Sequence, residues 1–383
     1  MNERNRNTPV HKWLVEPLPA GVQGSLERLA RAQDVEYIAV LPDVHLADDV
    51  CVGVAVATNR LLYPAAVGSD IGCGMAAIRF DAQVDLLASE QAAGELLAGL
   101  IRAVPSLKHA TQTAPADLPA CLRDGPLSHP RLDKLKSREA RLQLGTLGRG
   151  NHFLEFQSDE QERLWLMVHS GSRSMGQAIS AHHVAAGAAG RDRQSLVALD
   201  ADSTSGQAYL QDAAWAIQYA EENRLAIVGT VSRLMQSLFG VAAHAESLSQ
   251  CHHNHVRREA HFGKNWWVHR KGALSAKADE PGLIPGSMGT ESFHVTGRGH
   301  SPSLCSSSHG AGRAMSRRDA FRRVTRRQFE RELKGIWFDH RRIDALRDEA
   351  PSAYKDIAAV LRAQHDLTRI ERRLRPLLSY KGT

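Results

Sequence analysis

The sequence predicts an α+β fold built as one domain over residues 1–383. Short β-branched segments alternate with amphipathic helical segments, and no internal repeat or linker divides the chain. Segments rich in His, Cys, Asp and Gly lie in the first, middle and last thirds, so a site made from them needs all three parts. A length of 383 residues suits one large domain or two ordinary ones, and the scattered segments favour one.

In the first half, residues 25–32 have the pattern of a short helix, and residues 86–104 that of an Ala- and Leu-rich amphipathic helix. Alternating apolar and β-branched residues predict strands at 37–41, 50–57 and 75–80. The glycine-rich segment PAAVGSDIGCG at 64–74 predicts a sharp turn before the third strand.

In the second half, residues 111–130 are rich in Pro, Ala and Asp and predict a surface loop. Residues 208–239 have helical periodicity throughout, which predicts one long helix or two helices broken near Gly229. The predicted strands are 164–169, 266–270 and 292–296, and the predicted helices are 319–337 and 353–374.

Composition describes an ordinary globular chain with a basic balance. Hydrophobic residues make up 43% and charged residues 23%, and the net charge of +6 fits a polyanionic partner without identifying one. There is no run of about 18 apolar residues and no signal-like start, which predicts a cytoplasmic protein without a membrane segment. An odd number of cysteines, five, predicts free thiols or metal ligands.

The segment LCSSSHGAGR at 304–313 places one histidine in a glycine-lined loop. An imidazole nitrogen is a good nucleophile and, once protonated, a good leaving group, so His309 can carry a phosphoryl or nucleotidyl group. Gly310 and Gly312 let backbone N–H groups approach phosphate oxygens, and Arg313 could bind the remaining charge. Gly/Ser-rich loops with one histidine are also common, so this segment alone leaves both interpretations open.

Four further segments are dense in His, Cys, Asp and Gly: SDIGCGM (69–75), GTLGRGNHFLEF (145–156), VHSGSR (168–173) and CHHNHVRREAHFG (251–263). Two others belong with them, RKGALSA (270–276) and IPGSMGTESF (284–293). Together with SSSHGAGR, and in this order, they resemble the RtcB family of RNA ligases. The resemblance extends from LPDVH at 41–45 to the C-terminal SYKGT, and it implies that family's own fold, a single domain with a central dinuclear metal site.

Five residues in turns or at strand ends are candidate metal ligands: Asp70, Cys73, His152, His169 and His253. A bridging thiolate would let five residues fill two three-ligand sites. The resemblance implies that Asp70, Cys73 and His152 hold one ion and that Cys73, His169 and His253 hold the other. Imidazole and thiolate ligands favour zinc by affinity, whereas the resemblance implies two Mn²⁺ ions per chain. His252 is an alternative to His253 as a ligand. His45, His255 and His261 are expected to be packing or surface residues and not ligands, although His45 could act in RNA handling or support the metal site.

The resemblance also implies the reaction. His309 would attack the α-phosphate of GTP, GMP would pass to an RNA 3′-phosphate, and an RNA 5′-hydroxyl would displace it; a 2′,3′-cyclic phosphate would first be opened by metal-activated water. Glu155 is the expected reader of guanine, because a carboxylate accepts from N1–H and the N2 amine, and an exposed strand-end glutamate is the alternative. The expected nucleotide contacts are Asn151, His152, Phe153, Leu154, Glu155, His253, Asn254, Pro285, Gly286, Ser287, Met288, Ser292, His309, Gly310, Ala311, Gly312 and Lys381.

An arginine-rich run at 313–342 would, as a helix, present a basic face. Such a face is either a solvated surface or a groove for an RNA backbone, and a neighbouring nucleotidyl-transfer site favours RNA. The expected substrates are broken tRNA, rRNA or other RNA, in RNA repair or tRNA splicing. Archease or a release-factor-like protein is the partner that the resemblance suggests.

Four positions depart from the family pattern. Arg149 stands where glycine is usual, His255 where an aromatic residue is usual, and Ser307 where cysteine is common, while LADD at 46–49 replaces a loop with glycine and lysine. None of them removes a candidate ligand or His309, which indicates a divergent subgroup with a narrower RNA substrate.

Two other functions stay open. One is a metal-dependent 2′,3′-cyclic phosphodiesterase that does not ligate; intact SSSHGAGR, Glu155 and Lys381 argue against it. The other is an RNA- or nucleotide-binding protein that has lost catalysis, and the complete ligand set argues against that.

Overall fold

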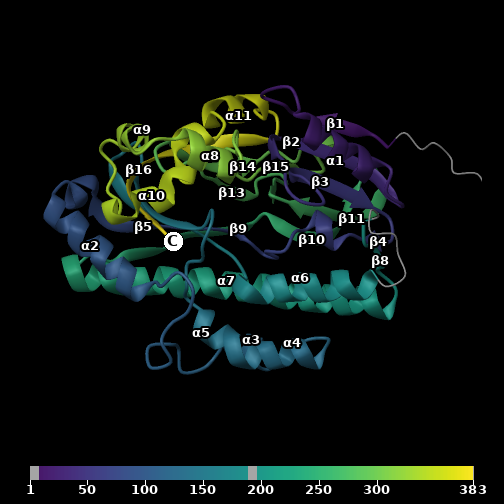
Figure 1. Cartoon of the computed structure of the whole chain (residues 1–383), viewed down its shortest axis with the longest axis horizontal. Helices are drawn as coiled ribbons and strands as arrows, with labels where there is room; N and C mark the ends of the chain where they lie inside the picture. Colours follow the sequence, from purple (N-terminus) through teal and green to yellow (C-terminus); the bar gives the residue numbers. More distant parts are fainter. Residues whose placement is uncertain (1–7, 189–195, 383) are drawn as a thin grey trace, which may run out of the picture.

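Two β-sheets lie side by side at the centre of the molecule, and helices cover them above and below (Figure 1). The computed structural model describes residues 8–188 and 196–382. The predicted domain of 1–383 therefore includes 1–7, 189–195 and 383, which lie outside the described residues. Helices and sheets are mixed within a single domain, which confirms the predicted α+β class.

The larger sheet has seven strands, and each neighbouring pair in it is antiparallel. Its strands, in spatial order, are β13 (Pro281–Ile284), β14 (Ser292–Gly297), β16 (Thr368–Lys381), β6 (Phe153–Ser158), β7 (Arg163–Ser170), β5 (Gly74–Gln83) and β9 (Ala243–His252). The two edge strands, β13 and β9, contact each other, so the sheet curls almost into a barrel.

The smaller sheet has five strands in the order β1 (Val10–Lys12), β2 (Val35–His45), β3 (Val52–Thr58), β11 (Lys264–Lys271) and β10 (Asn254–His261). Strand β1 is parallel to β2, and the other pairs are antiparallel. Two short pairs complete the β structure: β12 (Ala273–Ser275) with β15 (Ser306–Ser308), and β4 (Leu61–Leu62) with β8 (Leu199–Asp200).

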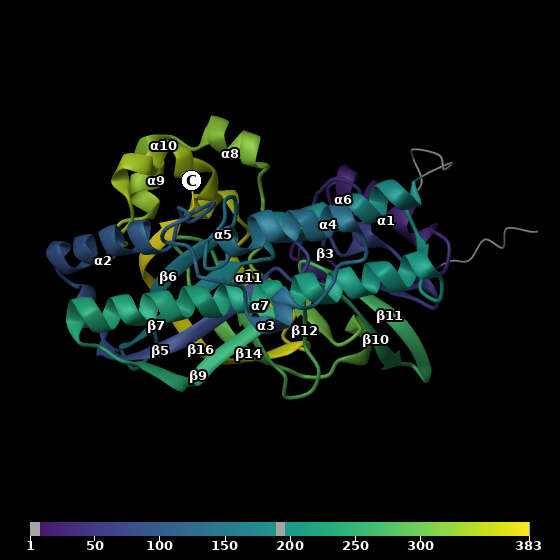
Figure 2. The same ribbon diagram turned by 90° about the horizontal axis from the view of Figure 1, so that it is seen from below.

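Helices lie in layers around the sheets. The 36-residue helix α7 (Thr204–Phe239) runs beneath the larger sheet beside α6 (Arg173–Gly187) and α2 (Glu90–Ala103), as Figure 2 shows from below. The short helices α3 (Ala120–Arg123), α4 (Pro130–Leu135) and α5 (Arg141–Gln143) lie under α6 and α7 in Figure 1. The remaining helices lie on the opposite side: α1 (Ala20–Ala30), α8 (Arg317–Arg323), α9 (Arg326–Glu332), α10 (Ile343–Leu346) and α11 (Ile357–Ala363).

Most of the predicted elements are confirmed. All six predicted strands form, as parts of β2, β3, β5, β7, β11 and β14, and the predicted helices 25–32 and 86–104 correspond to α1 and α2. Helix α7 is continuous through Gly229, so the alternative of a break there is wrong. It begins where the Ser203 hydroxyl accepts from the Gly206 N–H, and it ends at Gly240, whose φ of +68° a residue with a side chain rarely adopts.

Three expectations are wrong in part. The predicted helix 319–337 is two helices, because Val324 is extended and Thr325 caps α9 by accepting from the Gln328 N–H. The predicted helix 353–374 is instead the short α11 followed by the strand β16. The apolar residues of this segment have the spacing of a helix face, but β16 pairs with β14 on one side and with β6 on the other. The loop 111–130 contains α3, and its leucines are buried in a core with α7: Leu118, Leu122 and Leu127.

Candidate active site

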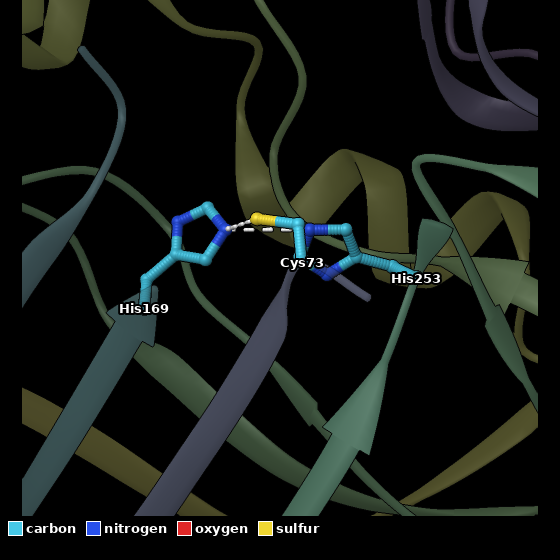
Figure 3. Close-up of side chains that lie close together, drawn as sticks. All are labelled: Cys73, His169 and His253. Atoms are coloured by element: carbon cyan, nitrogen blue, oxygen red, sulfur yellow. Dashed lines mark hydrogen bonds between the residues drawn. The ribbon is translucent and has the colours of Figure 1, made fainter. Parts of the chain in front are cut away.

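Four neighbouring strands of the larger sheet end at the same edge and bring four candidate ligands together. His152 precedes β6, His169 lies near the end of β7, Cys73 precedes β5 and His253 follows β9. Because adjacent strands are antiparallel, the starts of β6 and β5 meet the ends of β7 and β9. Figure 3 shows Cys73, His169 and His253 converging from three of these strands.

Asp70 joins this group through the glycine turn before β5. The Cys73 N–H donates to the Asp70 carbonyl (3.1 Å), which turns both side chains toward the cluster. Gly72 has a φ of +75°, and a Cβ there would lie 2.7 Å from the Cα of Ile217 in α7. The turn therefore packs on α7 only with glycine at this position.

Two groups of three possible ligands result, Cys73 with His169 and His253, and Asp70 with Cys73 and His152. Within each group the ligand atoms lie within 4.8 Å of one another, and Cys73 belongs to both. The Cys73 Sγ is 3.2 Å from His169 Nε2 and 3.3 Å from His152 Nε2, and the Nε2 atoms of His169 and His253 are 3.3 Å apart. These are the two groups that the resemblance implied.

Neighbouring groups fix the orientation of the imidazoles. His169 Nδ1–H donates to the Asn151 carbonyl (3.1 Å), which leaves the Nε2 lone pair facing Cys73. Arg173 can only donate to His152 Nδ1 (3.0 Å), so the His152 proton lies on Nε2, 3.0 Å from Asp70 Oδ2. That proton occupies the position that a metal ion would take.

The electrostatics of the cluster fit a cation. Burial holds the pKa values of His169 and His253 well below the usual range, so both rings are neutral and can act as ligands. Burial, together with the Asp70 charge, raises the pKa of the Cys73 thiol. A metal ion would supply the positive charge that ionises this thiol, and the set of one thiol, three imidazoles and one carboxylate suits a transition metal.

Helix α7 supports the cluster from below. The guanidinium of Arg224, which is fully buried, donates to the carbonyls of Gly72 and Ser170, each at 3.1 Å. It therefore ties the turn before β5 to the end of β7. Sequence reasoning missed Arg224, because a basic residue in a helix is far more often exposed.

His309 follows β15 and lies beside the cluster, with its ring centre 4.7 Å from that of His253. The Asp43 carboxylate, from β2, accepts from His309 Nδ1–H (2.7 Å) and from the His309 backbone N–H (3.0 Å) through the same oxygen. Nε2 of His309 is then the unprotonated nitrogen, as a nucleophile requires. The segment LPDVH does not reveal this role of Asp43, since an aspartate in a strand carries no signal of its distant partner.

One cavity of about 820 Å³ joins His309 and the cluster to most of the expected nucleotide contacts. It lies where the two sheets meet, since residues of β2, β3 and β11 line it together with residues of β6, β7 and β16. The expected contacts that line it are Asn151, Phe153, Glu155, His253, Asn254, Pro285, Gly286, Ser287, Met288, Ser292, His309, Gly310, Ala311, Gly312 and Lys381. Of the other two, His152 lies in the metal cluster, and the Leu154 side chain points into the apolar core below the sheet.

One part of the cavity combines carboxylates, a lysine and aromatic rings. Glu155 is 3% exposed, and burial raises its pKa to about 8. The Lys381 ammonium bonds to Glu349 and lies 5.8 Å from the Phe153 ring centre. The Tyr354 hydroxyl donates to Glu349 (2.7 Å), and Tyr354 also lines the cavity. Glu349 and Tyr354 were not found from the sequence, in which no motif marks them.

Two sequence-based expectations change here. The Arg313 guanidinium is occupied within the protein, since it donates to Met315 O (3.0 Å), Asp348 O (2.7 Å) and the Tyr354 hydroxyl (3.2 Å). It is therefore not available as a fork for phosphate in this structure. His252 turns away toward α7 and bonds to Glu221 (2.7 Å), so it is not an alternative ligand.

His45, His255 and His261, which were not expected to be ligands, lie outside the two ligand groups. His45 lines the cavity, and its Nδ1–H donates to the Asp43 carbonyl (2.8 Å). His255 and His261 lie against Arg270 and Glu259 in the smaller sheet.

A buried thiol and imidazole cluster beside a histidine whose ring is oriented by a carboxylate, open to one large cavity, is typical of metal-dependent enzymes that act on phosphate esters. The sequence profile of the family described as tRNA-splicing ligase RtcB matches residues 25–382, and the chain therefore belongs to the RtcB family.

The chain is similar in sequence to named relatives over nearly its whole length. The chain is 37% identical to the RNA-splicing ligase RtcB of Escherichia coli strain K12, with 98% of each chain covered. It is 29% identical to the RNA-splicing ligase RtcB of Mycobacterium tuberculosis, over 89% of this chain and 96% of that one. It is also 28% identical to the tRNA-splicing ligase RtcB of Methanococcus maripaludis, over 94% and 91%.

Within the described ranges, none of the helices combines the length and apolar character needed to cross a lipid bilayer.

Proposed function

We propose that this protein is an RNA ligase that joins RNA 3′-phosphate or 2′,3′-cyclic phosphate ends to 5′-hydroxyl ends at the expense of GTP. Membership of the RtcB family supports RNA ligation in general. The observation that carries the specific proposal is the position of His309, which Asp43 orients beside the Cys73 cluster in a cavity that also contains Glu155 and Lys381.

In the first step, the His309 Nε2 lone pair attacks the α-phosphorus of GTP, a P–N bond forms and pyrophosphate leaves. Asp43 holds the Nδ1 proton throughout and stabilises the positive charge that develops on the ring. An RNA 3′-phosphate oxygen then takes the GMP from His309, giving an RNA-(3′)pp(5′)G end. The RNA 5′-hydroxyl attacks the 3′-phosphorus in the last step, the phosphodiester forms and GMP leaves.

Glu155 and Lys381 are proposed to select guanine. The carboxylate would accept from N1–H and the N2 amine, and the ammonium would donate to O6 or N7. Phe153 and Tyr354 line the same part of the cavity and offer ring faces for the base. The backbone N–H groups of Met288, Gly310 and Gly312, which line the cavity, would bind the sugar and phosphates.

Two Mn²⁺ ions are proposed as the resident metals, one held by Asp70, Cys73 and His152 and the other by Cys73, His169 and His253. Bound there, they would supply Lewis-acid stabilisation of phosphate charge and an activated water for opening a cyclic phosphate.

The arginines of α8 and α9 are proposed to bind the RNA backbone. Although the predicted single helix is two helices, Arg318, Arg322, Arg323, Arg326 and Arg327 are all exposed. They begin directly after Arg317, which lines the cavity. Backbone binding by this surface would weaken steeply with salt. A cytoplasmic location and a partner such as archease or a release-factor-like protein stay predictions.

The test is incubation with α-labelled GTP and Mn²⁺, followed by denaturation and gel electrophoresis. We expect acid-labile label on the wild type, and none with ATP or in His309→Ala. Absence of label with Mn²⁺, Zn²⁺ and Mg²⁺ would contradict the ligase proposal. Hydrolysis of a 2′,3′-cyclic phosphate in the absence of label would favour the phosphodiesterase instead.

A further inference from the structure

Gln157 is a buried polar side chain that no part of the proposed reaction uses. It lies on β6 two residues after Glu155, so both side chains point to the same face of the strand. Gln157 is 0% exposed, and its amide nitrogen lies 3.8 Å from the Met167 sulfur. Burial of an amide costs free energy unless the amide is hydrogen-bonded, so a methionine or leucine would be the ordinary residue here.

The amide nitrogen of Gln157 donates two hydrogen bonds. One goes to Glu155 Oε1 (2.7 Å) and the other to Ser292 Oγ (3.0 Å) on β14. Ser292 Oγ also accepts from the Gly286 N–H (3.4 Å). Gln157 therefore links Glu155 to the loop Pro285–Met288, and these residues are proposed to contact opposite ends of one nucleotide.

This arrangement fixes the orientation of the Glu155 carboxyl group. The bond from Gln157 occupies one lone pair of Oε1 and holds the plane of the carboxyl group, which lines the cavity. Among the described residues, the Gln157 carbonyl Oε1 has no hydrogen-bond partner. The position of the buried Gln157 amide therefore satisfies its NH₂ group, whereas its carbonyl oxygen stays without a partner in the described part of the chain.

We propose that Gln157 is a positioning residue that sets the preference for guanine by holding the Glu155 carboxyl group in the plane of the base. The inference rests on the proposed role of Glu155. Guanine presents two donors, N1–H and N2–H, side by side in one plane, so a carboxyl group that rotates freely would bind it less well than a fixed one. Adenine presents no such pair and gains nothing from the fixed orientation.

The test is the affinity of Gln157→Met for GTP and ATP in the absence of metal, measured by calorimetry. Methionine keeps the size of the side chain and removes both donors. At pH 8.5, where Glu155 is ionised, we expect the GTP affinity to fall about 10- to 100-fold, as for a lost bond to a charged group, and the ATP affinity to stay unchanged. Gln161→Met is the matched control, because Gln161 is exposed in the turn between β6 and β7, and its GTP affinity should equal that of the wild type.

The outcomes separate the two proposals. If the wild type binds GTP no better than ATP, the guanine assignment of Glu155 fails, and the role of Gln157 fails with it. If Glu155→Gln loses the preference but Gln157→Met keeps it, only the role of Gln157 is overturned.

A measurement on the wild type covers the case in which Gln157→Met does not fold. The side-chain amide resonance of Gln157 should shift on addition of GTP and not of ATP. An amide signal that responds equally to both nucleotides, or to neither, would overturn the proposal.

Discussion

The orientation of the His309 ring depends on one acceptor oxygen of Asp43. Asp43 Oδ2 accepts from both the ring Nδ1–H and the backbone N–H of His309, so one carboxylate sets the tautomer and the position of the proposed nucleophile. Asp43→Asn removes the charge and keeps the size of the side chain. We expect the rate of label transfer from GTP to His309 to fall by about 100-fold or more.

Single-turnover labelling measures this rate, with Asp49→Asn as the control, since Asp49 is exposed in the loop after β2. Equal rates in Asp43→Asn and the wild type would show that the ring needs no carboxylate partner. Thermal unfolding of both variants would check that the fold is kept.

The proposed contact of Glu155 with guanine should depend on pH. Burial raises its pKa to about 8, with the Lys381 charge and Gln157 acting in the opposite direction, so the carboxyl group of the free protein is neutral at pH 7. Since guanine N1–H and N2–H bind the ionised form better, the affinity for GTP should rise with pH and level off above about pH 8. The rise should be at most about tenfold per pH unit.

Calorimetry from pH 7.0 to 8.5 would measure this dependence, with ATP as the reference for the titration of the phosphates. Glu155→Gln should show no such rise. The same slope in that variant would assign the pH dependence to another group.

At this scale, residues within motifs were predictable and their partners were not. His152, His169 and His253 stand beside Gly, Ser or Asn in recognisable segments, and the structure brings them together with Asp70 and Cys73. Asp43 and Glu349 act on residues far away in the sequence, which local patterns do not report. Arg313 stands next to the nucleophile loop but is satisfied by Asp348 and Tyr354, a fact that only the tertiary structure contains.

At the scale of elements, the order of the strands explains the site better than any single motif. The strands β6, β7, β5 and β9 are neighbours, and each contributes one ligand at the same edge. The strand patterns themselves were predictable, because their alternation is local. The misassigned β16 shows the limit of such patterns, since Leu367, Ile370 and Leu374 have helix-like spacing, and the pairing with β14 and β6 decides the conformation.

Helix α7 offers a test of helix stability that leaves the site untouched. Gly229 lies within the continuous helix, and a Cβ there would meet only the far end of Arg233, at 3.6 Å. Gly229→Ala should therefore raise the free energy of unfolding by about 0.5–1 kcal/mol. Gly206→Ala in the first turn should lower it, because its Cβ would lie 2.0 Å from the Asp200 carbonyl oxygen.

Chemical denaturation of both variants measures these changes. A loss of stability in Gly229→Ala would show that α7 needs glycine at this position for a reason other than local space.

At the scale of the whole molecule, the proposed metals would act as a clamp. The five candidate ligands come from segments that span residues 70 to 253, so bound ions would connect parts of the chain that are far apart in sequence. Mn²⁺ at about 100 times its Kd should raise the free energy of unfolding by about 2.7 kcal/mol.

Thermal unfolding with Mn²⁺ and with a chelator would measure the stabilisation. Cys73→Ala should lose most of it, because Cys73 belongs to both ligand groups, whereas Cys121→Ala should keep it, because Cys121 is exposed and outside the cluster. An equal gain in all three proteins would show that Mn²⁺ binds elsewhere.

The position of β16 has a consequence for biosynthesis. This strand lies between β14 and β6, in the middle of the larger sheet, yet it follows every other strand of that sheet in sequence. While the ribosome makes the chain, β6, β7, β5 and β9 can assemble on one side and β13 with β14 on the other, each with an unpaired edge. We expect the sheet of a nascent chain to remain incomplete until β16 has been synthesised and inserted. Because exposed strand edges promote aggregation, we expect chaperones to be required until then.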